Sequence, residues 1–475
     1  MEDAILSVGI DIGTSTTSMV VSRLSVKNTA SCFTVPHVAI TDKEIVYRGG
    51  IYQTPQAEGN RIDADAVSEI LKEEYKRAGI TPEMVQTGAV IITGESSRKE
   101  NARLVTEKMS SLAGEFVVAS AGPDLESIIA GKGAGAQQYS KNDACTVANF
   151  DVGGGTTNIA IFKSGELIAR GCYDIGGRLI RVSDRRITYI SERLTHIIHE
   201  TGAGLSVGGE TNLSEIRKVT DRMAEILGES VGILKETRVC QLSKSVESSE
   251  LKKPERIDHI TFSGGVADYV YRPSEDWFKH GDIGPILADS IRRSSWVERS
   301  GLQRAEETIR ATVIGAGSYT TSVSGSTVSF SNEDIFPMKN IPAFTVSEEQ
   351  EQKLLQGDGE EYCEHALWFR RESSTENIIF AISHIGNPSY KEVLHLADVL
   401  MQASETLPES QPLLIVCKED FAKVLGMALI RKMGQKRDIV CLDNIYAISG
   451  DYIDFGRPLM NGMVVPVVVK TLIFG

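Results

Sequence analysis

Residues 9–17 (GIDIGTSTT) and residues 150–157 (FDVGGGTT) repeat one pattern: apolar strand, Asp, glycine turn, then hydroxyl residues that enter another strand. A glycine turn directs backbone N–H groups toward one point, and the missing Cβ lets a phosphate come close. Asp11 and Asp151 end their strands and suit a hydrated Mg²⁺ ion, which prefers oxygen ligands and keeps several waters. The repeat predicts two related half-structures that face one phosphate chain and its metal.

The repetition matters more than either turn. A single turn of this type is more often an ordinary β-hairpin, whereas two copies between strands favour the functional interpretation. No Walker A loop (GxxxxGK[ST]) occurs in the sequence. Residues 131–135 (GKGAG) follow a predicted helix rather than a strand, so we expect close helix packing there instead of a phosphate loop.

Composition excludes several classes of function. The 475 residues carry a formal net charge of -14 and contain no long basic run, which disfavours nucleic-acid backbones and anionic membrane surfaces as partners. Seven scattered cysteines form no C-x-x-C pair, which disfavours a disulfide framework or a zinc site and favours a reducing cytosol. The first residues lack the pattern of a signal peptide. We therefore expect a cytoplasmic protein.

The hydrophobic pattern predicts three structural parts. We expect helices at residues 63–78, 97–114, 189–199, 213–235 and 302–315, and an exposed loop or the rim of a subdomain at 236–256. The pattern loosens around 330–346, and strands then alternate with helices as in a small α/β unit. The expected division is a first lobe at 1–143 completed by about 311–340, a second lobe with a helical subdomain at 144–310, and a C-terminal α/β unit at 341–475.

Five motifs in order resemble the superfamily of actin, sugar kinases and DnaK-type chaperones. They are a first phosphate motif at 9–17, a connecting helix at 122–131, a second phosphate motif at 151–157, an adenosine motif at 262–266 (FSGGV) and a second connecting helix at 311–317. The resemblance implies a duplicated actin-like ATPase fold, with two ribonuclease H-like lobes around a nucleotide cleft and an added C-terminal α/β unit. Small residues in both helices imply a hinge between the lobes.

The resemblance also implies the site residues. Those expected to bind nucleotide are Gly13, Thr14, Ser15, Thr16, Gly153, Gly154, Gly155, Thr156, Thr157, Gly264 and Gly265; those expected to act in hydrolysis are Asp11, Asp151, Glu95 and Asp174, with Asp11 and Asp151 as metal ligands. Chaperones place a metal-linked Asp where this chain has Cys172, with Asp174 two residues on, and no counterpart of their catalytic lysine is identifiable. We therefore expect slow rather than fast ATP hydrolysis.

A narrower resemblance covers the whole chain. Residues 93–102, 149–177, 450–459 and 464–470 resemble the ethanolamine ammonia-lyase reactivating factors. That family implies ATP and Mg²⁺ as cofactors and the adenosylcobalamin-dependent lyase as partner, from which damaged cobalamin is ejected so that intact coenzyme can bind. It also implies a place in ethanolamine utilisation, in the cytoplasm and in association with a bacterial microcompartment. The oligomeric state stays open.

Two alternatives share the expected fold. In a small-molecule kinase, Glu95 after Gly94 would line a substrate pocket and accept a proton, whereas a surface capping carboxylate or a role beside the metal is favoured over this. In an actin-like assembly ATPase, the chain would form filaments, which an added α/β unit disfavours. The tail beyond residue 341 contains no motif with its own chemistry, and we expect it to dock the partner enzyme or to complete a lobe.

Overall fold

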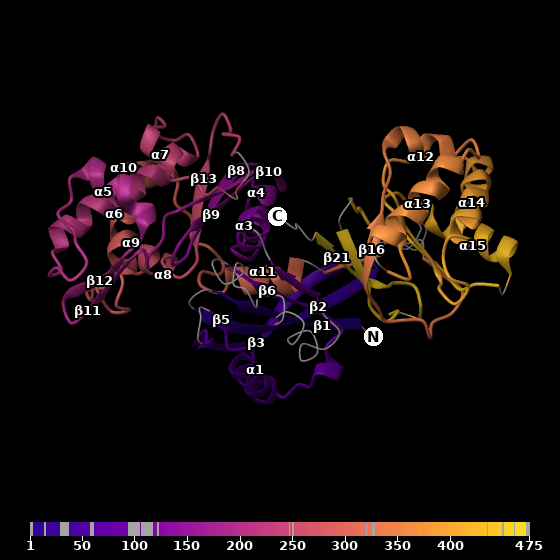
Figure 1. Ribbon diagram of the computed structural model, residues 1–475, viewed down its shortest axis with the longest axis horizontal. Coiled ribbons are helices and arrows are strands. Elements are labelled where there is room, and N and C mark those ends of the chain that lie inside the picture. The colour runs from indigo at the N-terminus through magenta and orange to yellow at the C-terminus, as the bar shows by residue number, and fades with distance from the viewer. Residues whose placement is uncertain are drawn as a thin grey trace.

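The computed structural model describes residues 3–13, 16–28, 38–57, 61–93, 105, 117–120, 123–246, 248, 251–319, 321–324, 328–373, 375–434, 436–448, 451–459 and 461–471. Figure 1 shows three bodies in a row: the second lobe with its helices at one end, the first lobe in the middle, and the C-terminal unit at the other end. None of the helices in these ranges combines the length and apolar character needed to cross a bilayer.

The first lobe is a five-stranded sheet with the strand order β3-β2-β1-β6-β7. Its elements are β1 (Asp3–Ile12), β2 (Thr16–Asn28), β3 (Val38–Gln53), β6 (Thr87–Ile92) and β7 (Val117–Ser120), with β4 (Gln56–Ala57), β5 (Arg61–Ile62), α1 (Ala64–Ala78) and the 3-10 turn η1 (Pro82–Met84). The strands β1, β2 and β3 are antiparallel, whereas β6 and β7 run parallel to β1. This is the strand order of a ribonuclease H-like lobe.

The second lobe repeats the order as β10-β9-β8-β13, in which β13 runs parallel to β8. Its elements are β8 (Thr146–Val152), β9 (Thr157–Lys163), β10 (Glu166–Tyr173), β11 (Ile180–Ser183), β12 (Arg186–Ile190), β13 (His259–Ser263), η3 (Glu192–Leu194), α5 (Thr195–Thr201), α6 (Leu213–Ser230), α7 (Arg238–Leu242), α8 (Ala267–Tyr271), α9 (Gly284–Arg293) and α10 (Ser295–Arg299). The duplication confirms the predicted actin-like fold.

Two helices cross between the lobes at very short range. They are α3 (Pro123–Gly133), which continues into α4 (Ala136–Asn142), and α11 (Ala311–Tyr319). A Cβ on Gly133 would lie 1.9 Å from the carbonyl oxygen of Ala311, and one on Gly315 would lie 2.1 Å from that of Ile129. Only glycine fits at both positions, which confirms the expectation of close helix packing.

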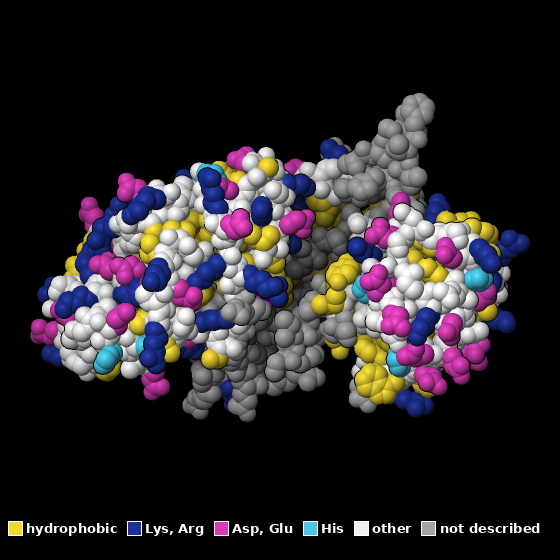
Figure 2. Space-filling view, turned by 90° about the horizontal axis from the view of Figure 1, so that it is seen from above, with side chains coloured by type: hydrophobic (Ala, Val, Ile, Leu, Met, Phe, Trp, Pro, Cys, Tyr) yellow, Lys and Arg dark blue, Asp and Glu magenta, His cyan; other side chains and the backbone are white. Residues whose placement is uncertain are grey.

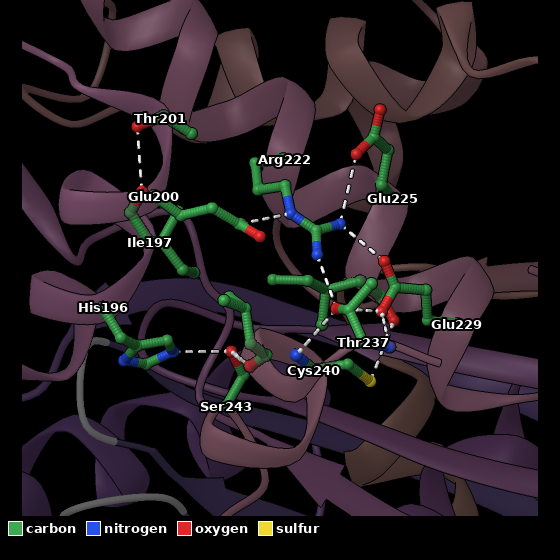
Figure 3. Close-up of polar contacts among 12 residues, drawn as sticks. His196, Ile197, Glu200, Thr201, Arg222, Glu225, Glu229, Thr237, Cys240 and Ser243 are labelled. Carbon is green, nitrogen blue, oxygen red and sulfur yellow. Dashed lines mark hydrogen bonds and ion pairs between the residues drawn. The ribbon is translucent and has the colours of Figure 1, made fainter. Parts of the chain in front are cut away.

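A partly buried arginine joins the helices of the helical subdomain (Figure 3). Arg222 on α6 donates to Glu200 at the end of α5 (2.6 Å), to Glu229 two turns further along α6 (2.6 Å) and to Thr237 at the start of α7 (2.7 Å). Burial alone would lower the pKa of Arg222, but its bonds to Glu200 and Glu229 outweigh this, so the pKa lies above its usual range. These contacts join three helices into one rigid body.

The C-terminal unit is an eight-stranded sheet with the order β14-β21-β20-β16-β17-β18-β19-β15. Its elements are β14 (Thr321–Val323), β15 (Ser329–Phe330), β16 (Met338–Phe344), β17 (Ile379–Ile382), β18 (Leu413–Cys417), β19 (Ile439–Leu442), β20 (Asp451–Phe455), β21 (Pro466–Thr471), α12 (Glu348–Leu354), α13 (Glu360–Glu372), α14 (Tyr390–Ser404) and α15 (Ala422–Met433). Val468 of β21 belongs to one buried apolar cluster with Ala89 and Ile91 of the first lobe, so the unit is anchored there.

The C-terminal unit begins earlier than expected. Residue 341, its expected start, lies inside β16, and the preceding strands β14 and β15 already belong to the sheet of this unit. β14, β15 and the first residues of β16 therefore belong to the C-terminal sheet, whereas α11 packs on the first lobe. β14 pairs with β21, more than 140 residues further along the chain, through Thr321 opposite Val468. A local hydrophobic pattern cannot reveal such a long-range pairing.

Three predicted elements differ locally from the structure. The helix expected at 302–315 begins only at Ala311, because Leu302 instead pairs with Ile260 at the edge of β13. Residues 186–190 form β12, so the helix expected at 189–199 is replaced by a strand, the turn η3 and the short α5. Residues 236–256, expected to form an exposed loop or the rim of a subdomain, contain α7, whose Cys240 is buried in the core of the second lobe. The helix expected at 97–114 lies outside the described residues apart from position 105.

We expect Gly133→Ala to lower the stability of the chain by about 1–3 kcal/mol, because its Cβ would overlap the Ala311 carbonyl and push the crossing helices apart. Gly386→Ala is the matched control, since a Cβ there meets nothing within 4 Å. Thermal and urea unfolding of the three proteins measure the effect. Equal stability of the Gly133 variant and wild type would contradict the tight crossing.

Candidate functional site

The two glycine turns have the same geometry. In the first, the Gly13 N–H donates to the carbonyl of Thr16 at 2.9 Å; in the second, the Gly153 N–H donates to that of Thr156 at 2.9 Å. The following hairpin strands, β2 and β9, return antiparallel to β1 and β8. The sequence repeat is therefore also a structural repeat.

Each Asp of the repeat is held by a hydroxyl from the parallel neighbouring strand. Thr93 follows β6 and donates to Asp11 at 2.8 Å. Ser263 ends β13 and donates to Asp151 at 2.6 Å. Because β6 is parallel to β1 and β13 is parallel to β8, both hydroxyls arrive at the carboxyl end of the strand that carries the Asp.

A buried hydrogen-bond chain supports Asp151. Thr261 donates to the side-chain oxygen of Asn149 at 2.8 Å, and the Asn149 amide donates to Ser263 at 3.0 Å. Ser263 in turn donates to Asp151. All four residues are at most 5 % exposed. A fully satisfied buried network of this kind fixes the orientation of its last acceptor.

Both carboxyl groups are electrostatically strained. Burial raises the pKa of Asp11 to about 7, the hydrogen bond from Thr93 lowers it, and the charge of Asp151 raises it again. Burial raises the pKa of Asp151 to about 6 against the effect of Ser263. Two like charges in a shared low-dielectric site disfavour double ionisation unless a cation lies between them. The pair therefore fits a divalent metal.

One cavity of about 730 Å³ brings most predicted site residues together between the lobes. The predicted residues that line it are Asp11, Gly13, Thr16, Asp151, Gly153, Gly154, Gly155, Thr156, Gly264 and Gly265. Its volume falls in the range of small-molecule sites, about 300–1,000 Å³. The adenosine motif thus shares a cavity with both phosphate motifs.

Other predicted residues lie elsewhere. The Thr157 side chain is buried and donates to the carbonyl of Ile175 at 2.8 Å, so it stabilises the turn and does not line the cavity. Asp174 forms an ion pair with Arg193 at 3.3 Å and is also absent from the cavity wall. Burial raises the pKa of the Cys172 thiol above its usual range. Thr14, Ser15 and Glu95 lie outside the described residues.

The structure also adds residues that sequence reasoning did not assign. Thr93 and Ser263 were visible at strand ends, but their partners follow only from the parallel strand register. Three further residues line the cavity: Glu126 in the first connecting-helix motif, Tyr52 on β3, and Arg178, which follows β10. Glu126 lies within the motif at 122–131 and Arg178 directly follows the segment 149–177, but no sequence motif marks Tyr52.

The glycine turns leave space for a ligand. A Cβ on Gly155 or Gly265 would meet nothing within 4 Å, although both residues line the cavity. Packing within the protein therefore does not demand glycine at these two positions, whereas a closely approaching ligand would. No group of three or more His, Cys, Asp or Glu side chains suited to a metal occurs in the described ranges. Two carboxylates with several waters and phosphate oxygens match this sparse donor set for Mg²⁺.

Comparison with known proteins assigns the family. A family model described as "Ethanolamine utilisation protein EutA" matches residues 3–475. The chain belongs to the EutA family. "Ethanolamine ammonia-lyase reactivase EutA" of Escherichia coli (strain K12) is 36% identical over 478 residues, covering 99% of this chain and 98% of that protein. The protein of the same name from Salmonella typhimurium (strain LT2) is 35% identical over 479 residues, with the same coverage. The family resemblance is confirmed.

Solved structures are more distant from this EutA family member. The Aquifex aeolicus Ppx/GppA family member is 16% identical with a TM-score of 0.40, covering 66% of this chain and 97% of that one. EutJ from Carboxydothermus hydrogenoformans is 15% identical with a TM-score of 0.33, covering 66% and 89%. MreB5 of Spiroplasma citri, solved with ADP bound, is 15% identical with a TM-score of 0.29, covering 65% and 94%. The assignment of the fold therefore rests on strand order and register.

The raised pKa of Asp11 predicts a pH-dependent stability. The folded chain binds this proton more tightly than the unfolded chain, so stability falls as the pH rises from the unfolded value of 3.8 through about 7. We expect Asp11→Asn to be more stable than wild type by about 1–3 kcal/mol at pH 8 without divalent metal, with the gap closing toward pH 4. Urea unfolding across this pH range measures it.

Asp174→Asn is the matched control, because it breaks an ion pair with Arg193 and should bring no gain at pH 8. Added Mg²⁺ should stabilise wild type more than Asp11→Asn. An Asp11 variant that is no more stable than wild type at pH 8 in the absence of metal would contradict the strained pair.

Proposed function

We propose that this EutA family chain is a reactivating ATPase for ethanolamine ammonia-lyase, which uses Mg²⁺ and ATP to release damaged cobalamin so that intact coenzyme can bind. The observation that carries the proposal is the duplicated Asp-glycine turn facing one cavity, in a chain whose family relatives are named as reactivases of that lyase. The proposal places its action in ethanolamine utilisation in the cytoplasm, in association with a microcompartment.

Each part of the cavity takes a role in this proposal. Asp11 and Asp151 hold a hydrated Mg²⁺, which when bound neutralises phosphate charge. The backbone N–H groups and hydroxyls of the two turns bind the phosphate oxygens. Gly265 lets the nucleoside approach the backbone, and Gly264 lies beside it in the cavity wall. A Cβ on Gly264 would also meet the Val152 carbonyl oxygen at 2.4 Å, so packing within the protein requires this glycine as well. The two lobes therefore contribute matching halves of one site.

The architecture offers a route from nucleotide to partner. The α3–α11 crossing is the narrow junction between the lobes, and the C-terminal unit is anchored to the first lobe through β21. Rotation of the second lobe about this crossing would change the spacing between the helical subdomain and the C-terminal unit, which lie at opposite ends of the molecule (Figure 1). A nucleotide can drive release only through different lyase affinities of its bound states.

The charges on the surface and the residues of the cavity wall bear on the class of partner and on the rate of ATP hydrolysis. On the face drawn in Figure 2, acidic and basic side chains of the described residues are interspersed at both ends of the molecule, and this mixture of charges supports a protein partner over a nucleic acid. The described residues lining the cavity contain no lysine, and Asp174 lies outside it. Both features support slow hydrolysis.

The proposal is tested by calorimetry with ATP, ADP and Mg²⁺, followed by an assay for reactivation of ethanolamine ammonia-lyase that holds damaged cobalamin. We expect wild type to bind ATP only weakly without Mg²⁺ and to reactivate the lyase only when both are present. Asp151→Asn should lose at least about tenfold in Mg²⁺-dependent affinity, because it removes one of two charged ligands. Transfer of labelled phosphate to ethanolamine would instead support a kinase, and sedimenting filaments would support an assembly ATPase.

Gly265→Ala separates ligand contact from folding. Because a Cβ at this position meets no protein atom within 4 Å, we expect unchanged thermal stability, whereas nucleotide affinity should fall about tenfold or more as the methyl group occupies cavity space. Gly386→Ala, equally open but distant in the C-terminal unit, should change neither property. Unaltered nucleotide binding by the Gly265 variant would contradict the assignment of the adenosine motif to the nucleotide site.

A further inference from the structure

The segment after strand β10 is clamped onto the second glycine turn. The Gly177 N–H donates to the carbonyl of Gly153 at 3.0 Å, and the Arg178 N–H donates to that of Gly154 at 2.7 Å. A Cβ on Gly176 would lie 2.4 Å from the Gly154 carbonyl oxygen. The backbone of Arg178 is therefore held against the proposed phosphate-binding loop.

The Arg178 side chain lines the central cavity with an unsatisfied donor. Its buried Nε has no hydrogen-bond partner in the described part of the chain. The carboxylate of Asp282 lies 3.9 Å from this nitrogen, which is beyond hydrogen-bond range. Asp282 also accepts from the Gly284 N–H at 2.9 Å, at the start of α9. Arg178 thus has a loose ion pair and spare donor capacity.

The charges of the cavity wall leave a phosphate chain short of protein cations. Its acidic residues in the described ranges are Asp11, Glu126, Asp151, Asp268 and Asp282, and its basic residues are Arg178, Arg181 and His280. Arg181 lies over the ring of Tyr189 at 5.0 Å, and His280 bonds the Tyr269 hydroxyl at 2.5 Å. Arg178 is the cation of this set whose backbone is bonded to a glycine turn.

We propose that Arg178 binds the terminal phosphate of the nucleotide and so distinguishes the triphosphate from the diphosphate; this rests on the proposed nucleotide binding. A guanidinium has five donors in a fixed planar fork and binds phosphate oxygens bidentately. Phosphate would replace the distant Asp282 carboxylate as its partner. Because Asp282 also bonds the first turn of α9, this exchange would report the nucleotide state to the helical subdomain.

Calorimetry with ATP and with ADP, each with Mg²⁺, tests the assignment on the full chain. We expect Arg178→Gln to weaken ATP binding by about 10- to 100-fold and ADP binding by less than about threefold, since a charged hydrogen bond to the terminal phosphate is lost. Arg185→Gln is the matched control: it removes the same charge from the exposed turn of the β11–β12 hairpin and should change neither affinity.

Arg178→Lys gives a second measurement that does not depend on the glutamine variant folding. It keeps the charge but loses the planar fork, so ATP affinity should fall between those of wild type and the glutamine variant while ADP affinity is retained. Equal ATP affinity of wild type and either folded Arg178 variant, or an equal loss for ATP and ADP, overturns the assignment. Absence of nucleotide binding by wild type instead overturns the proposed function itself.

Discussion

Parallel strand pairing is the constraint on which the site depends. Each lobe places an Asp at the end of its first strand, and the neighbouring parallel strand delivers the hydroxyl that holds it, Thr93 for Asp11 and Ser263 for Asp151. A parallel neighbour ends at the same edge of the sheet as its partner, so the two side chains meet without any special loop. Duplication of the lobe then produces two such corners that face one cavity.

The same arrangement concentrates charge. Two carboxyl groups with raised pKa values lie in a cavity whose wall is richer in acids than in bases. In the metal-free chain this arrangement is unfavourable, because burial penalises each charge and the charges repel. A divalent cation with its phosphate ligand would offset the repulsion between the two carboxylates. The electrostatic cost that lowers the stability of the metal-free chain is therefore also the source of the affinity for the cation.

The glycines divide into two physical classes. Gly133 and Gly315 are required by the protein itself, because carbonyl oxygens of the crossing helix occupy the space of a side chain. Gly155 and Gly265 face open cavity, so their small size serves a molecule other than the chain. The first class builds the junction between the lobes, and the second leaves the space in which a nucleotide would control that junction.

The sequence alone determined the repeat, the two carboxylates, the glycine turns and the α/β character, because each is written within a short stretch and follows from local preference. Most of the site residues predicted in this way, from Asp11 to Gly265, line the cavity, but the larger part of its wall was not predicted. The glycine-turn pattern placed Thr157 in the site and the resemblance to chaperones placed Asp174 there. Only the tertiary structure showed that the Thr157 side chain donates to the Ile175 carbonyl and that Asp174 pairs with Arg193. The tertiary structure also decided the roles of Thr93, Ser263 and Arg178 and placed β14 in the C-terminal sheet. Each of these depends on contacts between segments that are distant in the sequence, and no local preference encodes such contacts.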